Sequence, residues 1–284
     1  MQLKVTIIGL GLIGGSLGMA IKKKKLARVI GLTRDKSKAA LAVKMQAVDY
    51  ASMNIRGIIQ DADIIFICYP LHLIIPELRK TIQFVKPGAI ITDVGSSKEL
   101  IVKEAESIVP KGTYFVGGHP MAGKEKIGLE EAENDLFEGE NYILTKTSRT
   151  NDKALNTLKA FISKLGAKVQ VLSPVVHDSI VAGISHMPVA VAVALVDSVF
   201  RSGKLCSWMT ELAASGFRDT TRIASGDPKL GTDMFTTNKK AVLSSLNTFK
   251  KALSEIEKLI KQGNAAVIQD KLTQIKDFRD SIYE

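Results

Sequence analysis

The chain has 284 residues, of which 45% are hydrophobic and 24% are charged, and its formal net charge is +10. This composition excludes a disordered chain and is enough to bury one large core or two ordinary cores. The only dense basic run, residues 22–25, has no interleaved aromatic residues, so the charge predicts attraction of anionic small molecules and no nucleic-acid binding.

A glycine-rich turn follows the first predicted strand, residues 3–8, and precedes a helical pattern. Strand, GxGxxG turn and helix in this order are typical of a dinucleotide-binding site. Gly9 would make the turn, Gly11 would let the backbone approach a pyrophosphate, and Gly14 would let the helix pack on the strand. The helix amino terminus would hold the phosphates. The cofactor-binding residues expected here are Gly9, Gly11, Leu12, Ile13 and Gly14.

The end of the second predicted strand, residues 28–32, bears on the choice between NAD and NADP. An NAD site has an acidic side chain about 20 residues after the glycines, and this position holds Thr33. Arg34 can hold a 2′-phosphate in a fork, and hydroxyls such as that of Ser37 can donate to it. We therefore predict NADP, with NAD possible if Asp35 takes the ribose position after a shift of two residues.

The α/β pattern then continues to residue 172. Further strands are predicted at 64–68, 89–92, 113–116, 141–145 and 167–172, with helices at 71–85 and 152–165. The first of these strands ends at Tyr69 and Pro70, which we expect beside the cofactor. Ser96 and Ser97 follow the second and are either helix N-caps or hydroxyl donors to a ligand. All these strand ends are expected at the same edge of the sheet as the glycine turn.

A single imidazole stands between two glycine turns in the segment Gly117-Gly118-His119-Pro120-Met121-Ala122-Gly123. The first glycines would end the strand at 113–116 and turn His119 out over the carboxyl edge of the sheet, where α/β sheets bind ligands. There an imidazole can exchange a proton near neutral pH. The alternative is that His119 caps a turn or fills a gap in packing.

From Ser173 onward the sequence shows only helical periods. We therefore predict an α/β Rossmann domain, residues 1–172, followed by an all-α domain, residues 173–284, that builds a homodimer. His177 and His186 are nine residues apart and would lie on opposite faces of an unbroken helix, which argues against a shared metal site.

Residues 180–200 are apolar enough to resemble a membrane span, but polar residues and a proline interrupt them. A buried helix at a domain or subunit interface explains the run better than a membrane does. Cys68 and Cys206 lie in apolar sequence without metal-ligand spacing, which indicates a reducing compartment and no metal. Because no secretory leader precedes the first strand, we expect a cytoplasmic protein.

Another polar patch lies between two glycines at residues 216–226. Arg218 and Arg222 are four residues apart and would share a helix face. They are either an exposed ion-pair face or a short, positioned helix that captures a carboxylate.

Five segments together resemble the prephenate/arogenate dehydrogenase family of tyrosine biosynthesis. They are Gly9 to Gly14, Asp93-Val94-Gly95-Ser96-Ser97-Lys98, Gly118-His119-Pro120-Met121-Ala122-Gly123, Ser185-His186-Met187-Pro188 and Gly216-Phe217-Arg218-Asp219-Thr220-Thr221-Arg222. The resemblance covers essentially the whole chain, in order. It implies a Rossmann domain that carries the cofactor, a helical domain that builds the dimer, and an active site between them.

The resemblance also implies a reaction, the oxidative decarboxylation of a cyclohexadienol with hydride transfer to a nicotinamide. His119 would take the proton of the ring hydroxyl, and Ser96 would orient that hydroxyl. Arg222 would hold a substrate carboxylate. The substrate-binding residues that the resemblance implies are Arg222, His186, Asp219 and Glu125.

One departure from the family pattern favours arogenate as the substrate. Many members that use prephenate carry a second histidine three residues after the one that matches His186, and this chain has Val189 there. Prephenate dehydrogenase is the alternative.

A hydroxyacid dehydrogenase would need a lysine between residues 173 and 200, where none occurs. A non-catalytic NADP-binding redox sensor would not require His119.

Overall fold

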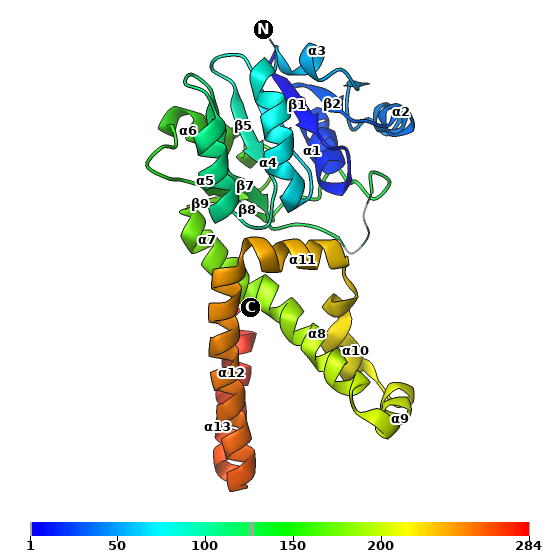
Figure 1. Cartoon of the computed structure of the whole chain (residues 1–284), viewed down its shortest axis with the longest axis vertical. Helices are drawn as coiled ribbons and strands as arrows, with labels where there is room; N and C mark the ends of the chain where they lie inside the picture. The colour runs from blue at the N-terminus through cyan, green and yellow to red at the C-terminus, as the bar shows by residue number, and fades with distance from the viewer. Residues whose placement is uncertain (1, 125, 127, 284) are drawn as a thin grey trace.

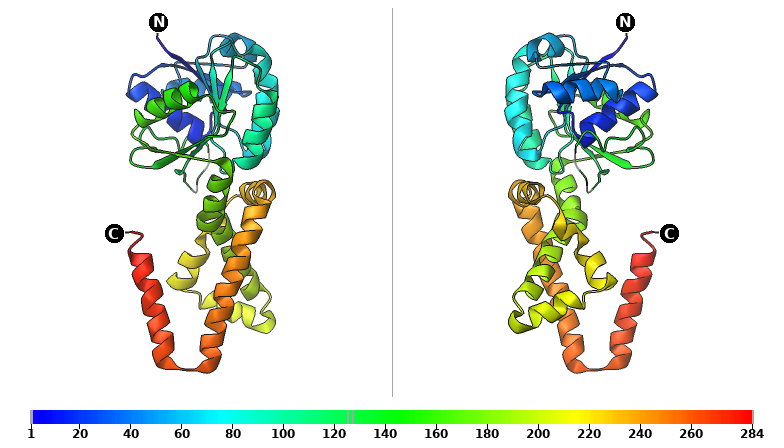
Figure 2. Two further views of the ribbon diagram at one scale, coloured as in Figure 1. Left: turned by 90° about the vertical axis from the view of Figure 1, so that its left-hand side faces the viewer. Right: turned by 90° about the vertical axis from the view of Figure 1, so that its right-hand side faces the viewer.

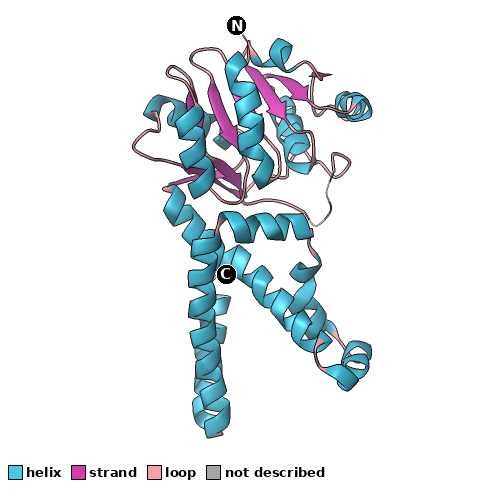
Figure 3. Ribbon diagram, viewed as in Figure 1, coloured by secondary structure: helices cyan, strands magenta, loops and turns pink. Residues whose placement is uncertain are grey.

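The computed structural model describes residues 2–124, 126 and 128–283. The amino-terminal part of the chain forms an α/β unit, and a purely helical part extends from one edge of it (Figures 1 and 3). The predicted succession of a Rossmann-type unit and a helical unit is therefore confirmed.

A six-stranded parallel sheet forms the centre of the α/β part, in the order β3-β2-β1-β4-β5-β6. Its strands are β1 (Lys4–Ile8), β2 (Arg28–Leu32), β3 (Tyr50–Ser52), β4 (Ile64–Ile67), β5 (Ile90–Asp93) and β6 (Tyr114–Val116). The strand order reverses between β1 and β4, and open α/β sheets bind nucleotides outside such a switch point. All four residues of β4 are buried, as expected of a strand covered on both faces.

Helices cover both faces of this sheet, so β1 separates two apolar cores. Ile7 belongs to one core and Ile8 to the other, because neighbouring side chains of a strand point to opposite faces. The helices are α1 (Leu12–Lys23), α2 (Lys36–Lys44), α3 (Ile55–Ile59), α4 (Leu71–Thr81), α5 (Glu99–Ile108) and α6 (Asp152–Ser163), with a 3-10 turn at Ile82–Phe84.

A second, three-stranded sheet positions the histidine singled out above. It consists of β7 (Gly118–Pro120), β8 (Asn141–Thr145) and β9 (Lys168–Leu172). His119 pairs with Ile143 in the antiparallel β7–β8 ladder. The first predicted strand end is confirmed, since β6 stops at Val116, but His119 itself lies in a short strand that the sequence did not predict, because its partner strand is distant in the sequence. Gly118 permits this path, since a Cβ there would lie 2.7 Å from the Asp93 carbonyl oxygen.

The helical part begins with two helices in line, α7 (Pro174–Val181) and α8 (Met187–Phe200), joined by a π-helical turn (Ala182–His186). Next come α9, α10 and α11, and the chain ends in a hairpin of α12 and α13 that projects away from the sheets (Figure 2). Their bounds are α9 (Cys206–Glu211), α10 (Ser215–Thr221), α11 (Pro228–Thr237), α12 (Lys239–Gln262) and α13 (Ala265–Asp280), with 3-10 turns at Gly203–Leu205 and Arg222–Ser225.

Two carboxylates of the helical part lie at the amino termini of helices from the α/β part. Asp178 on α7 accepts hydrogen bonds from the backbone N–H groups of Lys98 (2.7 Å) and Glu99 (2.8 Å), where α5 begins. Asp233 on α11 lies 2.8 Å from Nδ1 of His72, in the first turn of α4. Negative charge is favourable at both places because the N–H groups of a helix amino terminus are unpaired.

The alternative that Ser96 or Ser97 caps α5 was wrong. Neither hydroxyl bonds a backbone N–H of α5, and Ser97 Oγ instead lies 2.7 Å from Oγ1 of Thr237 on α11. The cap comes from Asp178, 80 residues away from Lys98 in the sequence, which leaves Ser96 available for another role.

Replacing Gly18 by alanine should destabilise the fold. A Cβ at Gly18 would collide with the carbonyl oxygen of Ala47, a backbone atom that cannot rotate away. We expect Gly18→Ala to lower the free energy of unfolding by about 1–3 kcal/mol, measured by chemical denaturation. Gly11→Ala is the matched control, since no atom lies within 4 Å of a Cβ there. Equal stability of the two variants would contradict the packing of α1 described here.

Candidate active site

The glycine turn between β1 and α1 has the geometry of a phosphate cradle. Gly9 has φ +97°, and a Cβ there would lie 2.5 Å from the Cys68 carbonyl oxygen. A Cβ at Gly14 would collide with the Gly9 carbonyl oxygen, whereas Gly11 faces open space. No side chain caps α1, so the backbone N–H groups of its first residues, Leu12 and Ile13, are available to an anion. The residues present fit a dinucleotide.

Thr33 follows directly after β2, as the sequence predicted, and its hydroxyl accepts from the Asp35 backbone N–H (3.3 Å). Asp35 caps α2 by accepting from the N–H groups of Ser37 (2.8 Å) and Lys38 (3.2 Å). Its bonds from Ser37 and Lys38 lower the pKa of this carboxyl. Asp35 thus serves as the N-cap of α2.

Arg34 lies at the same edge and is held by a carboxylate of α4. Its Nη2 donates to Oε2 of Glu77 at 2.8 Å, and Lys80 shares that oxygen at 3.2 Å. Burial, followed by the charge of Glu77, raises the pKa of Tyr69, so this phenol lies beside the ion pair. Pro70 occupies the N-cap position of α4. The structure thus gathers Arg34, Tyr69 and Pro70 near the start of α4.

His119 lies beside a second histidine that comes from the helical part. Its Nδ1 is 2.8 Å from Nε2 of His177, and Nδ1 of His177 is 2.7 Å from Oδ1 of Asp178. Burial lowers the pKa of His119 well below 6.5, and His177, Lys98 and His186 lower it further. The ring is therefore neutral at pH 7, and its Nε2 makes no hydrogen bond to any described residue, so it can accept a proton.

A fully buried ion pair lies next to this histidine. Lys98 Nζ binds Oδ2 of Asp93, and neither side chain reaches solvent. The Asp93 carboxylate also accepts from the N–H groups of Gly95 (2.9 Å) and Gly118 (3.2 Å). Burial lowers the pKa of Lys98, and Asp93 opposes that shift. The pair joins the end of β5 to the start of β7, and the sequence reasoning gave it no role.

Two predicted site residues have buried polar atoms without a hydrogen-bond partner among the described residues, Oγ of Ser96 and Nε2 of His186. Nδ1 of His186 lies 3.2 Å from the Asn238 side-chain nitrogen. Burial lowers the pKa of His186 to about 4, so this ring is also neutral. Buried polar groups are rarely left unpaired, which makes these two atoms candidates for contact with a polar ligand. Both His186 and His177 act electrostatically on His119, so the imidazoles form one cluster.

His177 lies on α7 and His186 ends the π-helical turn, so the two are not on one unbroken α-helix. Opposite faces were predicted for an unbroken α-helix, but a π turn holds more residues per turn and changes the register. Both imidazoles are fully buried. Within the described ranges, no group of three or more His, Cys, Asp or Glu side chains could hold a metal ion.

The predicted arginine site lies where α10 ends. α10 ends at Thr221 and Arg222 opens the following 3-10 turn, so the prediction that Arg218 and Arg222 share one helix face was wrong. Asp219 accepts from Nε of Arg218 at 3.1 Å, and both side chains are exposed. Glu125 lies outside the described residues.

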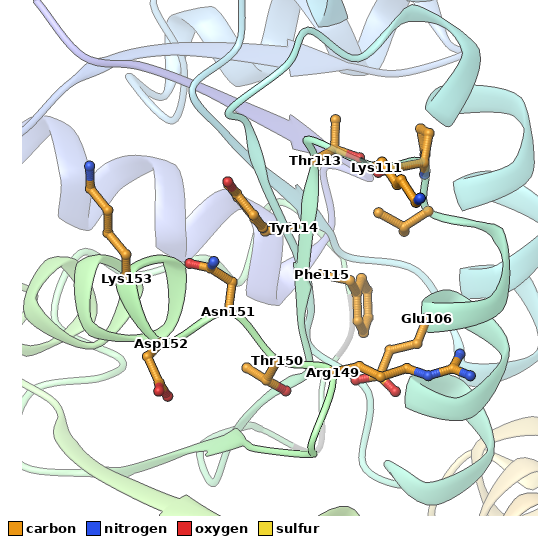
Figure 4. Close-up of a pocket in the computed structure, with 12 residues that line it drawn as sticks. Glu106, Lys111, Thr113, Tyr114, Phe115, Arg149, Thr150, Asn151, Asp152 and Lys153 are labelled. Atoms are coloured by element: carbon orange, nitrogen blue, oxygen red, sulfur yellow. Dashed lines mark hydrogen bonds between the residues drawn. The ribbon is translucent and has the colours of Figure 1, made fainter.

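A cavity of about 590 Å³ opens elsewhere, between α5, β6 and the start of α6 (Figure 4). Charged side chains such as Lys111, Arg149 and Asp152 line it. It contains none of the predicted site residues and is separate from the histidine cluster.

Two sequence models of one family match the chain. The model described as prephenate dehydrogenase, nucleotide-binding domain, matches residues 17–171, and the model described as prephenate dehydrogenase, dimerization domain, matches residues 173–274. The chain belongs to the prephenate/arogenate dehydrogenase family. The suspected family is thereby confirmed, and this prephenate/arogenate dehydrogenase is an oxidoreductase that couples oxidation to decarboxylation.

Relatives of this dehydrogenase span its whole length. Prephenate dehydrogenase of Bacillus subtilis is 34% identical over 285 residues, which cover 99% of this chain and 77% of the relative. The crystal structure of Synechocystis arogenate dehydrogenase has 38% identity and a TM-score of 0.88, covering 99% of this chain and 100% of that one. Prephenate dehydrogenase from A. aeolicus, in complex with hydroxyphenyl propionate and NAD+, has 30% identity and a TM-score of 0.93, covering 99% of both chains. A nicotinamide nucleotide is therefore the cofactor of this dehydrogenase.

Acid should destabilise this dehydrogenase through its buried neutral histidines. An unfolded histidine titrates near 6.5, whereas folded His186 does so at about 4. Between these values the unfolded chain binds the proton first, so the free energy of unfolding falls as the pH drops from 6.5 to 4. We expect His186→Gln to remove up to roughly 3 kcal/mol of that fall, measured by denaturation at pH 7 and pH 4. An equal loss in both proteins would show that His186 is not buried in the neutral form.

Proposed function

We propose that this protein is an NADP-dependent arogenate dehydrogenase that converts L-arogenate to L-tyrosine. The observation that carries the proposal is a neutral His119 in one part of the fold with two buried polar atoms, Oγ of Ser96 and Nε2 of His186, that have no hydrogen-bond partner among the described residues. We assign residues 1–172 to the cofactor domain and residues 173–284 to the dimerisation and substrate domain.

Each site residue has a separate role in the proposed reaction. A bound NADP supplies the hydride acceptor. His119 takes the proton of the ring hydroxyl at Nε2 as the carbinol hydride leaves, and Ser96 orients that hydroxyl through Oγ. The bond to the ring carboxylate breaks as carbon dioxide departs, and its electrons make the ring aromatic. His119 can then return the proton to the phenolate. General base catalysis of this kind contributes roughly 10²–10⁴ in rate.

The rest of the substrate would meet the helical part. Arg222 would bind a carboxylate, because a planar guanidinium suits that group, with Asp219 and Glu125 as acidic neighbours and His186 as a donor. Val189 favours arogenate, because it lies one turn after His186 on α8 and offers no polar group. Prephenate remains the second candidate, since the B. subtilis and A. aeolicus relatives are named prephenate dehydrogenases.

We propose a homodimer built by the helical domain. Large apolar side chains on α8, the segment after α9, and α13 are between 67% and 76% exposed in one chain, as Phe200, Leu212 and Phe278 show. The helical stretch Pro174–Phe200 is long and apolar enough to cross a membrane, which by itself is weak evidence. A second copy explains this exposed surface better, and the family model for this part is a dimerization domain. With free Cys68 and Cys206, we place the enzyme in the cytoplasm.

The direct test is an assay of the purified protein with arogenate or prephenate and with NADP or NAD, followed at the absorbance of the reduced nicotinamide. We expect the greatest kcat/KM with arogenate and NADP. His119→Asn should lower kcat by roughly 10²–10⁴ with the nucleotide Kd unchanged, because only the base is lost.

Three outcomes would count against the proposal. No turnover in any of the four combinations would refute the enzymatic assignment. Preference for prephenate would select the second candidate. A His119→Asn variant with unchanged turnover would show that this imidazole is not the base.

Arg34 is expected to set the cofactor preference. A charge-assisted fork to the 2′-phosphate would be lost in Arg34→Ala, so the KM for NADP should rise about 10- to 100-fold. The KM for NAD should change little, because NAD lacks that phosphate. Lys36→Ala, an exposed cation two residues away, is the matched control. Equal changes for the two nucleotides in Arg34→Ala would refute the NADP prediction.

A further inference from the structure

His177 and Asp178 are adjacent on α7 and fully buried, and the function proposed above gives neither of them a role. We propose that this pair fixes the tautomer of His119, so that its Nε2 lone pair faces the substrate hydroxyl. The proposal rests on the function proposed for His119 and makes His177 and Asp178 positioning residues for that base.

The donor and acceptor of each hydrogen bond can be assigned in turn, starting from Asp178. Its Oδ1 accepts from the Lys98 backbone N–H at 2.7 Å and its Oδ2 accepts from that of Glu99 at 2.8 Å. Two bonds from backbone N–H groups at a helix amino terminus suit an ionised carboxylate. An ionised carboxylate can only accept hydrogen bonds. Nδ1 of His177, 2.7 Å from Oδ1, therefore carries the hydrogen.

The same reasoning assigns the hydrogen bond between His177 and His119. The proposal takes the ring of His177 as neutral, and a neutral imidazole with its hydrogen on Nδ1 has a lone pair on Nε2. Nε2 of His177 therefore accepts, and Nδ1 of His119, 2.8 Å away, must donate. This leaves the lone pair of His119 on Nε2, the atom that a general base needs. The rings meet edge to face, with an interplanar angle of 72°, so the contact is not parallel stacking.

The pair also couples the base to the docking of the two parts of the chain. His119 belongs to β7, whereas His177 and Asp178 belong to α7. Asp178 caps α5, and its own carbonyl oxygen accepts from Asn238 at the junction of α11 and α12 (2.8 Å). The carboxylate thus lies between the helix that follows Ser96 and the helices that carry His186. When His119 takes up a proton, the positive ring keeps its donor bond to His177, and Asp178 compensates the charge.

The test compares two replacements of His177. Leucine removes the acceptor, whereas the Oε1 of glutamine can still accept from Nδ1 of His119. We expect His177→Leu to lower kcat by about 10²-fold and His177→Gln by about tenfold or less, since a wrong tautomer in a related relay costs up to about 10⁴. Neither should alter the nucleotide Kd. Ser179→Ala, an exposed change on the same helix, controls for disturbance of α7.

The tautomer itself is observable by ¹⁵N NMR of the protein with bound nucleotide and no substrate. We expect His119 to carry its hydrogen on Nδ1 in the unmodified protein and in His177→Gln, and to show a mixture in His177→Leu. The proposal is overturned if His119 carries its hydrogen on Nε2 in the unmodified protein, or if His177→Leu leaves both kcat and the tautomer unchanged. Because this measurement needs no turnover, a protein that oxidises neither substrate but shows the expected tautomers would refute the proposed function and support the pair.

Discussion

The contact between Asp178 and the start of α5 is the constraint on which the rest of the site depends. One carboxylate from the helical part satisfies two N–H groups of a sheet helix and, through His177, reaches the imidazole on β7. A second carboxylate of the helical part, that of Asp233, contacts His72 in the first turn of α4. Helix amino termini attract negative charge, so the same interaction that joins the two parts of the chain also aligns the groups between them.

Burial keeps the imidazoles of His119 and His186 neutral at physiological pH. The buried pair of Lys98 and Asp93 is costly to desolvate and is best explained by what it holds in place. Asp93 accepts hydrogen bonds from the backbone of both Gly95 and Gly118, after β5 and at the start of β7. Among the described residues, Oγ of Ser96 and Nε2 of His186 are buried without a hydrogen-bond partner, in contrast to this fully bonded pair.

Local sequence patterns predicted much of this arrangement. The strands at 28–32 and 141–145 occur as expected, and so does the glycine cradle, because strand periodicity and glycine geometry are local properties. The edge strand Tyr50–Ser52 was missed because three partly exposed residues carry almost no pattern. The strand conformation of His119 and the capping by Asp178 depend on partners 24 and 80 residues away, which no local pattern reveals. The adjacent His177-Asp178 was visible in the sequence, but only the fold brings it to His119.

The π-helical turn between α7 and α8 has a consequence for how this chain tolerates changes of length. A π turn can be regarded as an α-helix with one inserted residue. Deleting one residue from Ala182–Ser185 would let the two helices merge into a regular α-helix, and every side chain beyond it would rotate by about 100° relative to α7. His186 would then leave its buried position while the helix itself became more regular. The π-helical turn is thus the local distortion that allows α7 and α8 to run in line while His177 and His186 are both buried.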